Sequence, residues 1–551
     1  MGKKQTKSAL AVLLISLAIV FGCEEKHEQQ PKVVEPITIR IVHDPQTASV
    51  LTPLVNEFGN THPRLSDGTE VRFELVDRPA ILAAQEIADG RLKTDMWLSP
   101  LSSLTDWVNT NLQNLGPTQV ECMALFATPM VFAARADHTT LFNDRDGAFS
   151  WEAFIRARFP KAGNWIADAK KIGMTHILPT RRGEGLAALS QILALATPER
   201  SSSGTYSPID DSILGTIKEF EAIAAAYPEE STLPLSRLSS SQQTDIEFLL
   251  TSEQQLASFN ASRKKKGLPV ELRAYYPTEG SYWLDYRLCR SDADWVTAAH
   301  LTIARELVEY LRDTDRAQLS FRRAGFRPTT VQFEKEAPLT PEFGVNTALP
   351  EKSLPSMNGL EVAELLKDWP EVRRPEAIVF VLDASASMEG EAFDAAQRAY
   401  RRLIAELSRG DQAAIITFST EPQILSDFTQ DKFVLIQSMD KAQAIGGSAV
   451  YDAIKSAFDL FMDSKTVSNS RQKILVITDG DDKNSRHSDE RLAQILERRP
   501  EQRNIRFVIF ALTNEKPEHA DLALIAKSVN GEFYTSKIAE LEEAVQTRIA
   551  E

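Results

Sequence analysis

The chain has 551 residues, 43% of them hydrophobic, and its 62 basic and 77 acidic side chains give a formal net charge of −15. This length predicts two to four domains, and the hydrophobic content is sufficient for folded cores. An acidic chain repels phosphates, and no basic stripe with interleaved aromatic residues offsets that repulsion, so the composition argues against nucleic acid as a partner.

The N-terminus has the pattern of an export signal. Several lysines near Met1 precede an apolar run over residues 9–21, and Gly22 and Cys23 follow it directly. The run is too short for a transmembrane helix of ~20 residues. A charged start, an apolar centre and a small residue before the break predict a signal peptide over residues 1–22.

The sequence Val20-Phe-Gly-Cys23 resembles the bacterial lipobox. The resemblance implies cleavage before Cys23, acylation of its thiol and amine with fatty acids such as palmitate, and a lipid anchor in the bacterial cell envelope, either periplasmic or on the outer face of a membrane. Residues 23–36 are polar and would then be the tether. A plain secretory peptide cut nearby is the alternative for Cys23.

Residues 37–345 read as a second unit in which strands and helices alternate, so the fold class is α/β. Apolar, β-branched runs indicate strands, and apolar residues at helical spacing indicate helices. The predicted strands are 37–42, 71–75, 96–100 and the long run 125–134, and the predicted helices are 47–58 and 81–88.

This order of elements resembles bacterial extracellular solute-binding proteins of the two-lobed periplasmic type. Three later segments agree with it: Leu178-Pro-Thr-Arg-Arg-Gly-Glu-Gly185, Tyr276-Pro-Thr-Glu-Gly280 and Gly325-Phe-Arg-Pro328. The resemblance implies two α/β lobes joined by crossing strands, with a cleft between them for a small polar solute. A transport-linked or sensory solute receptor is therefore one function to consider.

The polar groups of such a cleft should come from strand-to-helix turns, where helix N–H groups and hydroxyls meet a ligand. Ordinary helix capping is the alternative for each of these residues. Two arginines in the second segment favour an anion and Glu184 opposes one, so the ligand class stays open. The candidate residues are Thr47, Ser102, Thr128, Thr180 and Gly183.

Beyond Cys23 the chain has only Cys122 and Cys289. An exported protein is in a compartment where disulfides persist. In the two-lobed fold that the resemblance implies, the outgoing and returning crossings run side by side, and the two cysteines lie close to them in sequence. We therefore expect a disulfide that ties the crossings together, with two buried free thiols as the alternative.

Residues 346–374 form a proline-rich connector that includes Pro350, Pro355 and Pro370. Several prolines and few glycines predict a semi-rigid spacer with contacts of its own. A short helix is expected over residues 360–368.

Residues 375–551 alternate again in the manner of a doubly wound α/β domain. Continuous apolar runs predict buried parallel strands. The predicted strands are 377–382, 413–418, 473–477 and 505–512, and the predicted helices include 391–408 and 541–549.

Oxygen-bearing side chains follow two of these strands. Asp383, Ser385 and Ser387 form an Asp-x-Ser-x-Ser sequence, Ser448 follows two glycines, and Asp479 ends the run Ile474-Leu-Val-Ile-Thr-Asp479. Carboxylate and hydroxyl oxygens are the ligands that Mg²⁺ prefers, and ligands gather at the carboxyl ends of parallel strands. The alternative is that the two aspartates only end strands and cap helices.

These three pieces, in this order, resemble the von Willebrand factor A domain. The resemblance implies a metal-ion-dependent adhesion site in which those five residues hold Mg²⁺, Mn²⁺ or Ca²⁺, directly or through water, and a protein partner supplies an acidic side chain. One position departs from the family: Ser448 stands where a threonine is usual, which keeps the hydroxyl but loses a methyl group that stiffens the rotamer.

No catalytic motif accompanies the metal motif. The chain has no Gly-x-Ser-x-Gly, no His-Glu-x-x-His, no Walker-type phosphate loop and no cysteine matched with a histidine. We therefore predict a binding and adhesion protein and not an enzyme, with the solute receptor as the alternative.

Overall fold

The computed structural model describes residues 36–110, 116–136, 148–151, 153–154, 173–197, 209–240, 246–329, 335–464, 467, 470–480, 482–498, 505–513, 519–529 and 531–550. The predicted signal peptide, Cys23 and all but the last residue of the tether lie outside the described residues.

The first lobe is built on a five-stranded sheet in the order β2-β1-β3-β10-β4. Strand β1 pairs in parallel with β2 and β3, whereas β10 runs antiparallel to both of its neighbours. The strands are β1 (Ile37–His43), β2 (Val71–Asp77), β3 (Met96–Ser99), β4 (Thr118–Ala124) and β10 (Arg287–Asp292), and the helices of this lobe are α1 (Ala48–Thr61), α2 (Ala80–Ala88), α3 (Ser102–Thr110), α9 (Ala298–Asp313) and α10 (Asp315–Arg323).

The second lobe is built on a sheet in the order β11-β5-β7-β6, with two more strands paired to β5. Its strands are β5 (Phe126–Arg135), β6 (Met174–His176), β7 (Phe248–Ser252), β8 (Leu272–Tyr275), β9 (Trp283–Leu284) and β11 (Arg327–Pro328), and its helices are α5 (Gly183–Ala196), α6 (Asp211–Glu221), α7 (Thr232–Leu238) and α8 (Glu253–Lys265). The long run predicted as one strand is β5.

The two lobes are joined by crossings that run side by side. On the outgoing path β4 leads into β5, and on the return path β9 leads into β10. The backbone N–H of Leu125 donates to the carbonyl of Tyr286 at 3.0 Å, and Thr128 pairs with Leu284. A single cluster of buried apolar side chains contains residues of both lobes, so the lobes share one continuous core.

The connector is not a free spacer, because its helix packs on both lobes. Helix α11 (Gly359–Val372) contacts α3 of the first lobe and α6 of the second. A capping box between Asn358 and Glu361 starts the helix, since each side chain accepts from the other residue's backbone N–H. The helix extends past its predicted end because Trp369 and Val372 are buried in the shared core.

The C-terminal domain has a six-stranded sheet in the order β14-β13-β12-β15-β16-β17. All of its pairings are parallel except that between β13 and β14. The strands are β12 (Glu376–Asp383), β13 (Gln412–Phe418), β14 (Pro422–Thr429), β15 (Arg471–Thr478), β16 (Arg506–Leu512) and β17 (Glu532–Ser536).

Helices cover both faces of this sheet, which confirms the doubly wound α/β fold. Apolar residues of α14, α15 and α16 form one buried cluster with the sheet, and those of α12, α13 and α17 form the other. These helices are α12 (Glu391–Glu406), α13 (Lys432–Met439), α14 (Val450–Asp463), α15 (Asp489–Glu497), α16 (Ala520–Ser528) and α17 (Leu541–Ala550).

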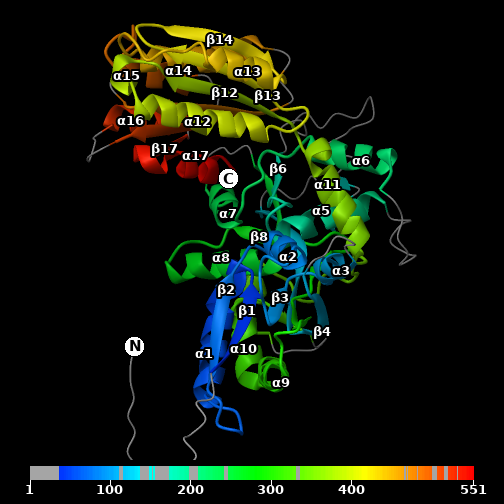
Figure 1. Cartoon of the computed structure of the whole chain (residues 1–551). Helices are drawn as coiled ribbons and strands as arrows, with labels where there is room; N and C mark the ends of the chain where they lie inside the picture. Colours follow the sequence, from blue (N-terminus) through cyan, green and yellow to red (C-terminus); the bar gives the residue numbers. More distant parts are fainter. Residues whose placement is uncertain are drawn as a thin grey trace, which may run out of the picture.

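The C-terminal domain lies on the second lobe, as the upper part of Figure 1 shows. Tyr227 is the centre of this contact. Its hydroxyl donates to Glu221 at 2.7 Å and accepts from the backbone N–H of Arg374 at 3.0 Å, and the guanidinium of Arg471 lies 4.3 Å from its ring centroid. Strands β12 and β15 therefore start at the junction between the C-terminal domain and the second lobe.

Candidate metal site

The candidate site lies at the carboxyl ends of β12 and β15, two parallel strands that pair directly. Asp383 is the last residue of β12, and Asp479 comes immediately after β15. Both strands are buried apolar runs that carry the chain through the centre of the sheet, so each delivers its aspartate to the same edge.

Asp383 is fully buried, and neighbouring groups fix its orientation. Its Oδ1 accepts from the backbone N–H of Ser385 at 2.9 Å, and its Oδ2 accepts from the hydroxyl of Thr478 at 2.6 Å. The pKa of Asp383 is raised to about 6, mainly by burial and also by the charge of Asp479, although these hydrogen bonds lower it. A cation at this edge would favour the ionised carboxylate.

The two serines of the first loop point their hydroxyls toward each other. Ser385 Oγ and Ser387 Oγ are 3.0 Å apart, and Ser385 is buried while Ser387 is exposed. A 3-10 turn over Ala386–Met388 places them on the same side of the loop. The predicted Asp-x-Ser-x-Ser group therefore forms one compact set of oxygen atoms.

The loop that contains Ser448 is fastened to the loop after β12. The backbone N–H of Ile445 donates to the carbonyl of Ala384 at 2.9 Å, and that of Ala386 donates to the carbonyl of Gly446 at 3.2 Å. These two hydrogen bonds hold the Gly-Gly-Ser segment beside the serines. The structure thus places all five predicted ligands on three adjoining loops.

Several buried polar atoms around this edge have no hydrogen-bond partner, and two of them belong to predicted ligands, namely Ser448 Oγ and Asp479 Oδ1. An unsatisfied buried polar atom costs about 1–3 kcal/mol, so such atoms are rare without a reason. A bound cation would satisfy both. The residues present therefore fit a divalent metal ion, with two carboxylates, hydroxyl groups and water as its ligands.

The site differs from a zinc centre in its donors. Among the described residues, no group of three or more His, Cys, Asp or Glu side chains is arranged to hold a metal ion. A cation between Asp383 and Asp479 would depend on serine oxygens for the rest of its protein ligands, which favours a hard cation such as Mg²⁺. His487 belongs to another contact, since its Nδ1 lies 2.7 Å from Asp452.

Thr478 is the residue that sequence reasoning missed. It is fully buried at the end of β15, and its hydroxyl holds Asp383 while also accepting from the backbone N–H of Gly480 at 3.0 Å. A polar residue at the end of an otherwise apolar strand, directly before Asp479, was the available signal.

The residues predicted for the interlobe cleft mostly have internal partners. Thr47 donates to the carbonyl of Asp44 at 2.8 Å, and Thr128 accepts from the backbone N–H of Gln254 at 3.0 Å. The backbone N–H of Ser102, at the start of α3, donates to Asp285. Thr180 lies half-buried in the turn before α5.

Side chains of the chain itself bridge the lobes at these turns. Arg182 Nη1 of the second lobe lies 3.1 Å from Oδ1 of Asp44 in the first, and both groups are buried. Gln46 donates to Glu184 at 3.0 Å across the same boundary. Gly183 is so close to the first lobe that a Cβ atom there would lie 2.4 Å from the ring of Pro100.

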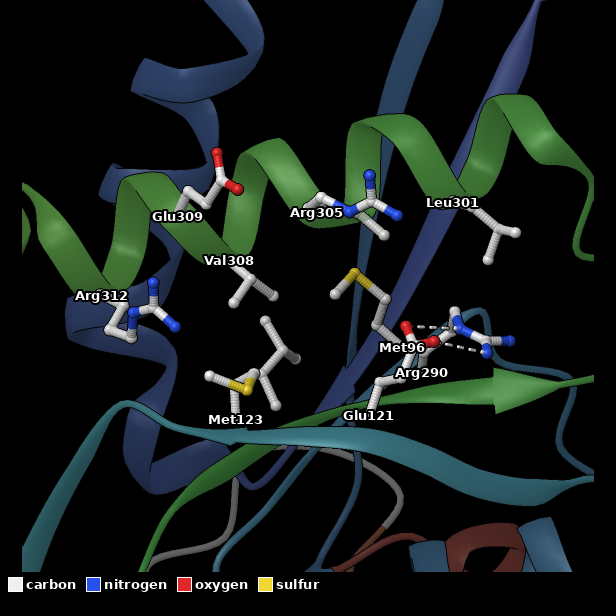
Figure 2. A pocket seen from close by; sticks show the side chains of 11 residues that line it. Met96, Glu121, Met123, Arg290, Leu301, Arg305, Val308, Glu309 and Arg312 are labelled. Carbon is white, nitrogen blue, oxygen red and sulfur yellow. Dashed lines mark hydrogen bonds and ion pairs between the residues drawn. The ribbon is translucent and has the colours of Figure 1, made fainter.

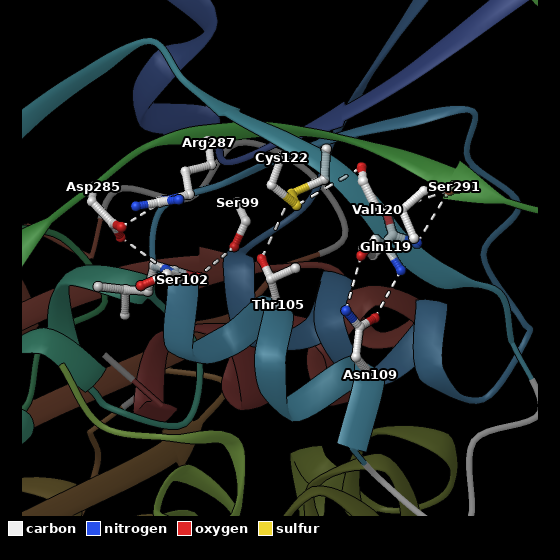
Figure 3. The surroundings of a disulfide bond; sticks show 12 residues. Ser99, Ser102, Thr105, Asn109, Gln119, Val120, Cys122, Asp285, Arg287 and Ser291 are labelled. Atoms are coloured by element: carbon white, nitrogen blue, oxygen red, sulfur yellow. Dashed lines mark hydrogen bonds and ion pairs between the residues drawn. A yellow bond between two sulfur atoms is a disulfide. The ribbon is translucent and has the colours of Figure 1, made fainter. Parts of the chain in front are cut away.

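Cys122 and Cys289 form a disulfide in the structure, with Cα atoms 4.0 Å apart. The bond joins neighbouring strands β4 and β10, at an irregularity in their register, and the hydroxyl of Thr105 lies 3.9 Å from Sγ of Cys289 (Figure 3). Both cysteines therefore belong to the sheet of the first lobe. The bond stiffens the strands that lead into and out of the crossings but does not itself connect the two lobes.

A pocket of about 260 Å³ lies on the first lobe between α9 and the strands of the disulfide (Figure 2). Its lining combines apolar side chains, among them Met96 and Met123, with three arginines and two glutamates. Arg290 and Glu121 pair with each other there at 3.2 Å. The charged side chains of the lining therefore nearly balance, with three basic and two acidic groups.

Comparison with known proteins places the C-terminal domain. Residues 378–481 match the family model of the von Willebrand factor type A domain. The human inter-alpha-trypsin inhibitor heavy chain H4 is 29% identical over 116 residues, which are 19% of this chain and 12% of that protein. The chain thus spans about an eighth of this relative.

Among the described residues, no helix is long and apolar enough to span a bilayer.

Solved structures resemble each part of the chain separately. A von Willebrand factor type A protein from Catenulispora acidiphila is 18% identical, with a TM-score of 0.29, over 32% of this chain and 43% of that one. A periplasmic thiamin binding protein is 12% identical, with a TM-score of 0.39, over 61% of this chain and 94% of that one. The family match shows that residues 378–481 belong to a von Willebrand factor type A domain.

Proposed function

We propose that this protein is a lipid-anchored binding and adhesion protein of the bacterial cell envelope, and that it captures a protein partner through a metal-ion-dependent adhesion site. Asp383, Ser385, Ser387, Ser448 and Asp479 would hold the ion, directly or through water. The observation that carries this proposal is the pair of buried oxygens without partners, Ser448 Oγ and Asp479 Oδ1, beside the buried carboxylate of Asp383.

The ion would be Mg²⁺, with Mn²⁺ or Ca²⁺ as substitutes of similar oxygen preference. When bound, it supplies a positive charge with a coordination position that an acidic side chain of the partner can fill. The residues of this chain orient the ion and keep its ligands desolvated. Binding is the whole of the proposed chemistry, because the sequence has no Gly-x-Ser-x-Gly, His-Glu-x-x-His or Walker-type motif.

The position of the site supports capture of a large partner. Strand β12 begins two residues after Arg374, and β15 begins at Arg471; both arginines contact the second lobe. At the other end, β12 finishes at Asp383 and β15 finishes one residue before Asp479. A strand of eight residues is about 26 Å long. The metal edge is therefore at the end of the domain that is remote from the lobe, where a partner can approach it.

The two lobes are proposed to be the scaffold that carries this domain. A solute receptor remains the alternative function, since the lobes have the architecture of one. In this structure the strand-to-helix turns that would bind a solute are bridged by Arg182 with Asp44 and by Gln46 with Glu184. These contacts favour lobes that are closed by their own side chains.

Crosslinking on intact cells, with and without chelator, tests the proposed function. The wild-type protein should yield defined crosslinked partners that disappear when the chelator is added, and Asp383→Ala should yield none. Partners that persist equally with chelator and in the variant would contradict capture through the metal. A rise in melting temperature with one member of a small-solute library, unaffected by chelator, would favour the receptor instead.

A further inference from the structure

The loop after Asp479 makes hydrogen bonds to both the backbone N–H and the backbone carbonyl of Ser448. The backbone N–H of Ser448 donates to Oδ1 of Asn484 at 3.0 Å. The carbonyl of Ser448 accepts from the backbone N–H groups of Lys483 and Asn484, both at 2.8 Å. Because the N–H is a donor, it must face the oxygen and not the nitrogen of the asparagine amide, so the contact fixes the orientation of this side chain.

The Asn484 amide also explains why residue 447 is a glycine. A Cβ atom on Gly447 would lie 1.8 Å from Oδ1 of Asn484 and 2.7 Å from its amide carbon. The asparagine side chain therefore occupies the space that any larger residue at position 447 would need. The Gly-Gly-Ser segment and Asn484 therefore pack directly against each other.

The loop that carries Asn484 is fastened a second time, one turn further along the chain from Ser448. Asp452, in the first turn of α14, accepts from the backbone N–H of Arg486 at 3.0 Å and pairs with Nδ1 of His487 at 2.7 Å. The backbone N–H of Asp452 donates to the hydroxyl of Ser485 at 3.0 Å. These contacts hold the loop in place independently of Asn484.

We propose that Asn484 is a positioning residue of the metal site, which fixes the main chain of Ser448 so that its buried, unpartnered hydroxyl is presented to the ion. The same contact links the loop of Ser448 to the loop of Asp479, so that the two ligands without hydrogen-bond partners are set relative to each other. This inference rests on the proposed metal site and adds a residue outside the five ligands.

The test compares Asn484→Ala with Asn484→Asp in the full mature chain. Titration calorimetry with Mn²⁺ should show affinity about tenfold weaker for the alanine variant, since residues that orient metal ligands typically contribute about 10–100-fold. The aspartate variant keeps an acceptor for the Ser448 N–H and adds a negative charge near the ion, so it should bind at least as well as wild type. Ser488→Ala is the control, because Ser488 caps α15 in the same loop and does not contact Ser448.

A double-mutant cycle separates positioning from a general loss of structure. Gly447→Ala should push the Asn484 amide aside and weaken Mn²⁺ binding by about the same tenfold as Asn484→Ala. The double variant should be no weaker than either single variant, because the clash disappears when the asparagine is gone. Losses that multiply would overturn the proposal.

Hydrogen exchange of the metal-free chain gives a readout that does not depend on the ion. The Ser448 amide should exchange at least tenfold faster in Asn484→Ala than in wild type, in the aspartate variant or in the Ser488 control. If wild type binds no Mn²⁺ while this difference is present, the proposed function fails and the positioning contact stands. If wild type binds Mn²⁺ and Asn484→Ala matches it in both measurements, the inference fails alone.

Discussion

Thr478 donates its hydroxyl hydrogen to Oδ2 of Asp383 at 2.6 Å, between the ends of two neighbouring strands. The other carboxylate oxygen accepts from the backbone N–H of Ser385. One contact comes from β15 and the other from the loop after β12, so the direction of the carboxylate depends on the register of the sheet. The geometry of the metal site is therefore set by the pairing of strands before any ion is present.

The first prediction concerns Asp383 as the central ligand. Asp383→Ala should abolish Mg²⁺ and Mn²⁺ binding in titration calorimetry, because serine hydroxyls cannot balance a divalent charge. Ser448→Thr should bind at least as well as wild type, since it keeps the oxygen and has a stiffer rotamer.

Asp427→Ala is the matched control for this experiment, because it removes an exposed carboxylate from the same domain. It should leave the metal affinity unchanged. Unchanged affinity in Asp383→Ala as well would reject the assignment of the site.

Much of this site was predictable from local sequence, because its ligands are at the ends of continuous apolar runs. Strands β12 and β15 are buried on both faces, and strands of this kind consist of nearly continuous apolar residues. Edge strand β14 has only one buried residue and no regular alternation, so no pattern predicted it. Its antiparallel pairing with β13 depends on contacts with neighbouring side chains, which the strand propensity of the residues does not include.

Interactions between distant segments could not be predicted in the same way. Thr478 acts on Asp383 through the register of two strands, and Arg182 meets Asp44 across 138 positions of sequence. The Cys122–Cys289 pair was expected between the crossings, but the structure places it within one sheet. Such pairings follow from tertiary packing, in which any polar residue has many candidate partners.

The second prediction concerns the carboxylate of Glu376 at the domain junction, whose side chain is 14% exposed. Burial alone would raise the pKa of Glu376, but the charges of Arg471, Lys473 and Arg373 outweigh it and hold the pKa well below its ordinary value of 4.5. Glu376→Gln should therefore lower the free energy of unfolding by about 3 kcal/mol at pH 7, because it removes the carboxylate that balances these three cations.

The sign of the pH dependence follows from the lowered pKa. The contribution of Glu376 is fully present above pH 4.5 and is lost as the pH falls below that value. Urea unfolding at pH 7, 5 and 3.5 should show a difference in the free energy of unfolding between wild type and variant. This difference should become smaller only at the lowest pH. The exposed Glu421→Gln is the control, and a difference that grows on acidification would contradict the prediction.

The third prediction concerns the disulfide. The bond closes a loop of 167 positions, for which the chain-entropy model gives roughly 5 kcal/mol of stability. The double variant Cys122→Ala/Cys289→Ala should lose up to about this much in urea unfolding. Titration of the denatured, unreduced protein should find no free thiol at these two positions, and two free thiols would refute the bond.

The fourth prediction concerns the membrane anchor, which we propose from the Gly22-Cys23 junction. Wild-type protein should partition into the detergent phase, because several acyl chains bind a membrane far more firmly than one. Cys23→Ser should appear in the aqueous phase or keep residues 1–22. A wild-type chain in the aqueous phase would reject the anchor, and intact residues 1–22 on the mature wild type would reject cleavage.

The fifth prediction concerns the ion pair between the lobes. Arg182 and Asp44 are both buried, and burial raises the pKa of Asp44 although Arg182 opposes this effect. Arg182→Ala should lower the free energy of unfolding by about 3–5 kcal/mol, because it leaves a buried carboxylate without its partner. The double variant with Asp44→Ala should recover part of that loss.

The neighbouring Arg181 provides the control for this cycle, since its 3.1 Å contact with Glu229 is partly exposed and should contribute less than about 1 kcal/mol. If Arg182→Ala is no less stable than Arg181→Ala, the bridge does not hold the lobes together. If wild-type stability also rises on addition of a small solute, the solute competes with the bridge for the cleft. That pair of results would make the lobes a receptor, whereas a large loss in Arg182→Ala without any solute effect is the behaviour of a closed scaffold.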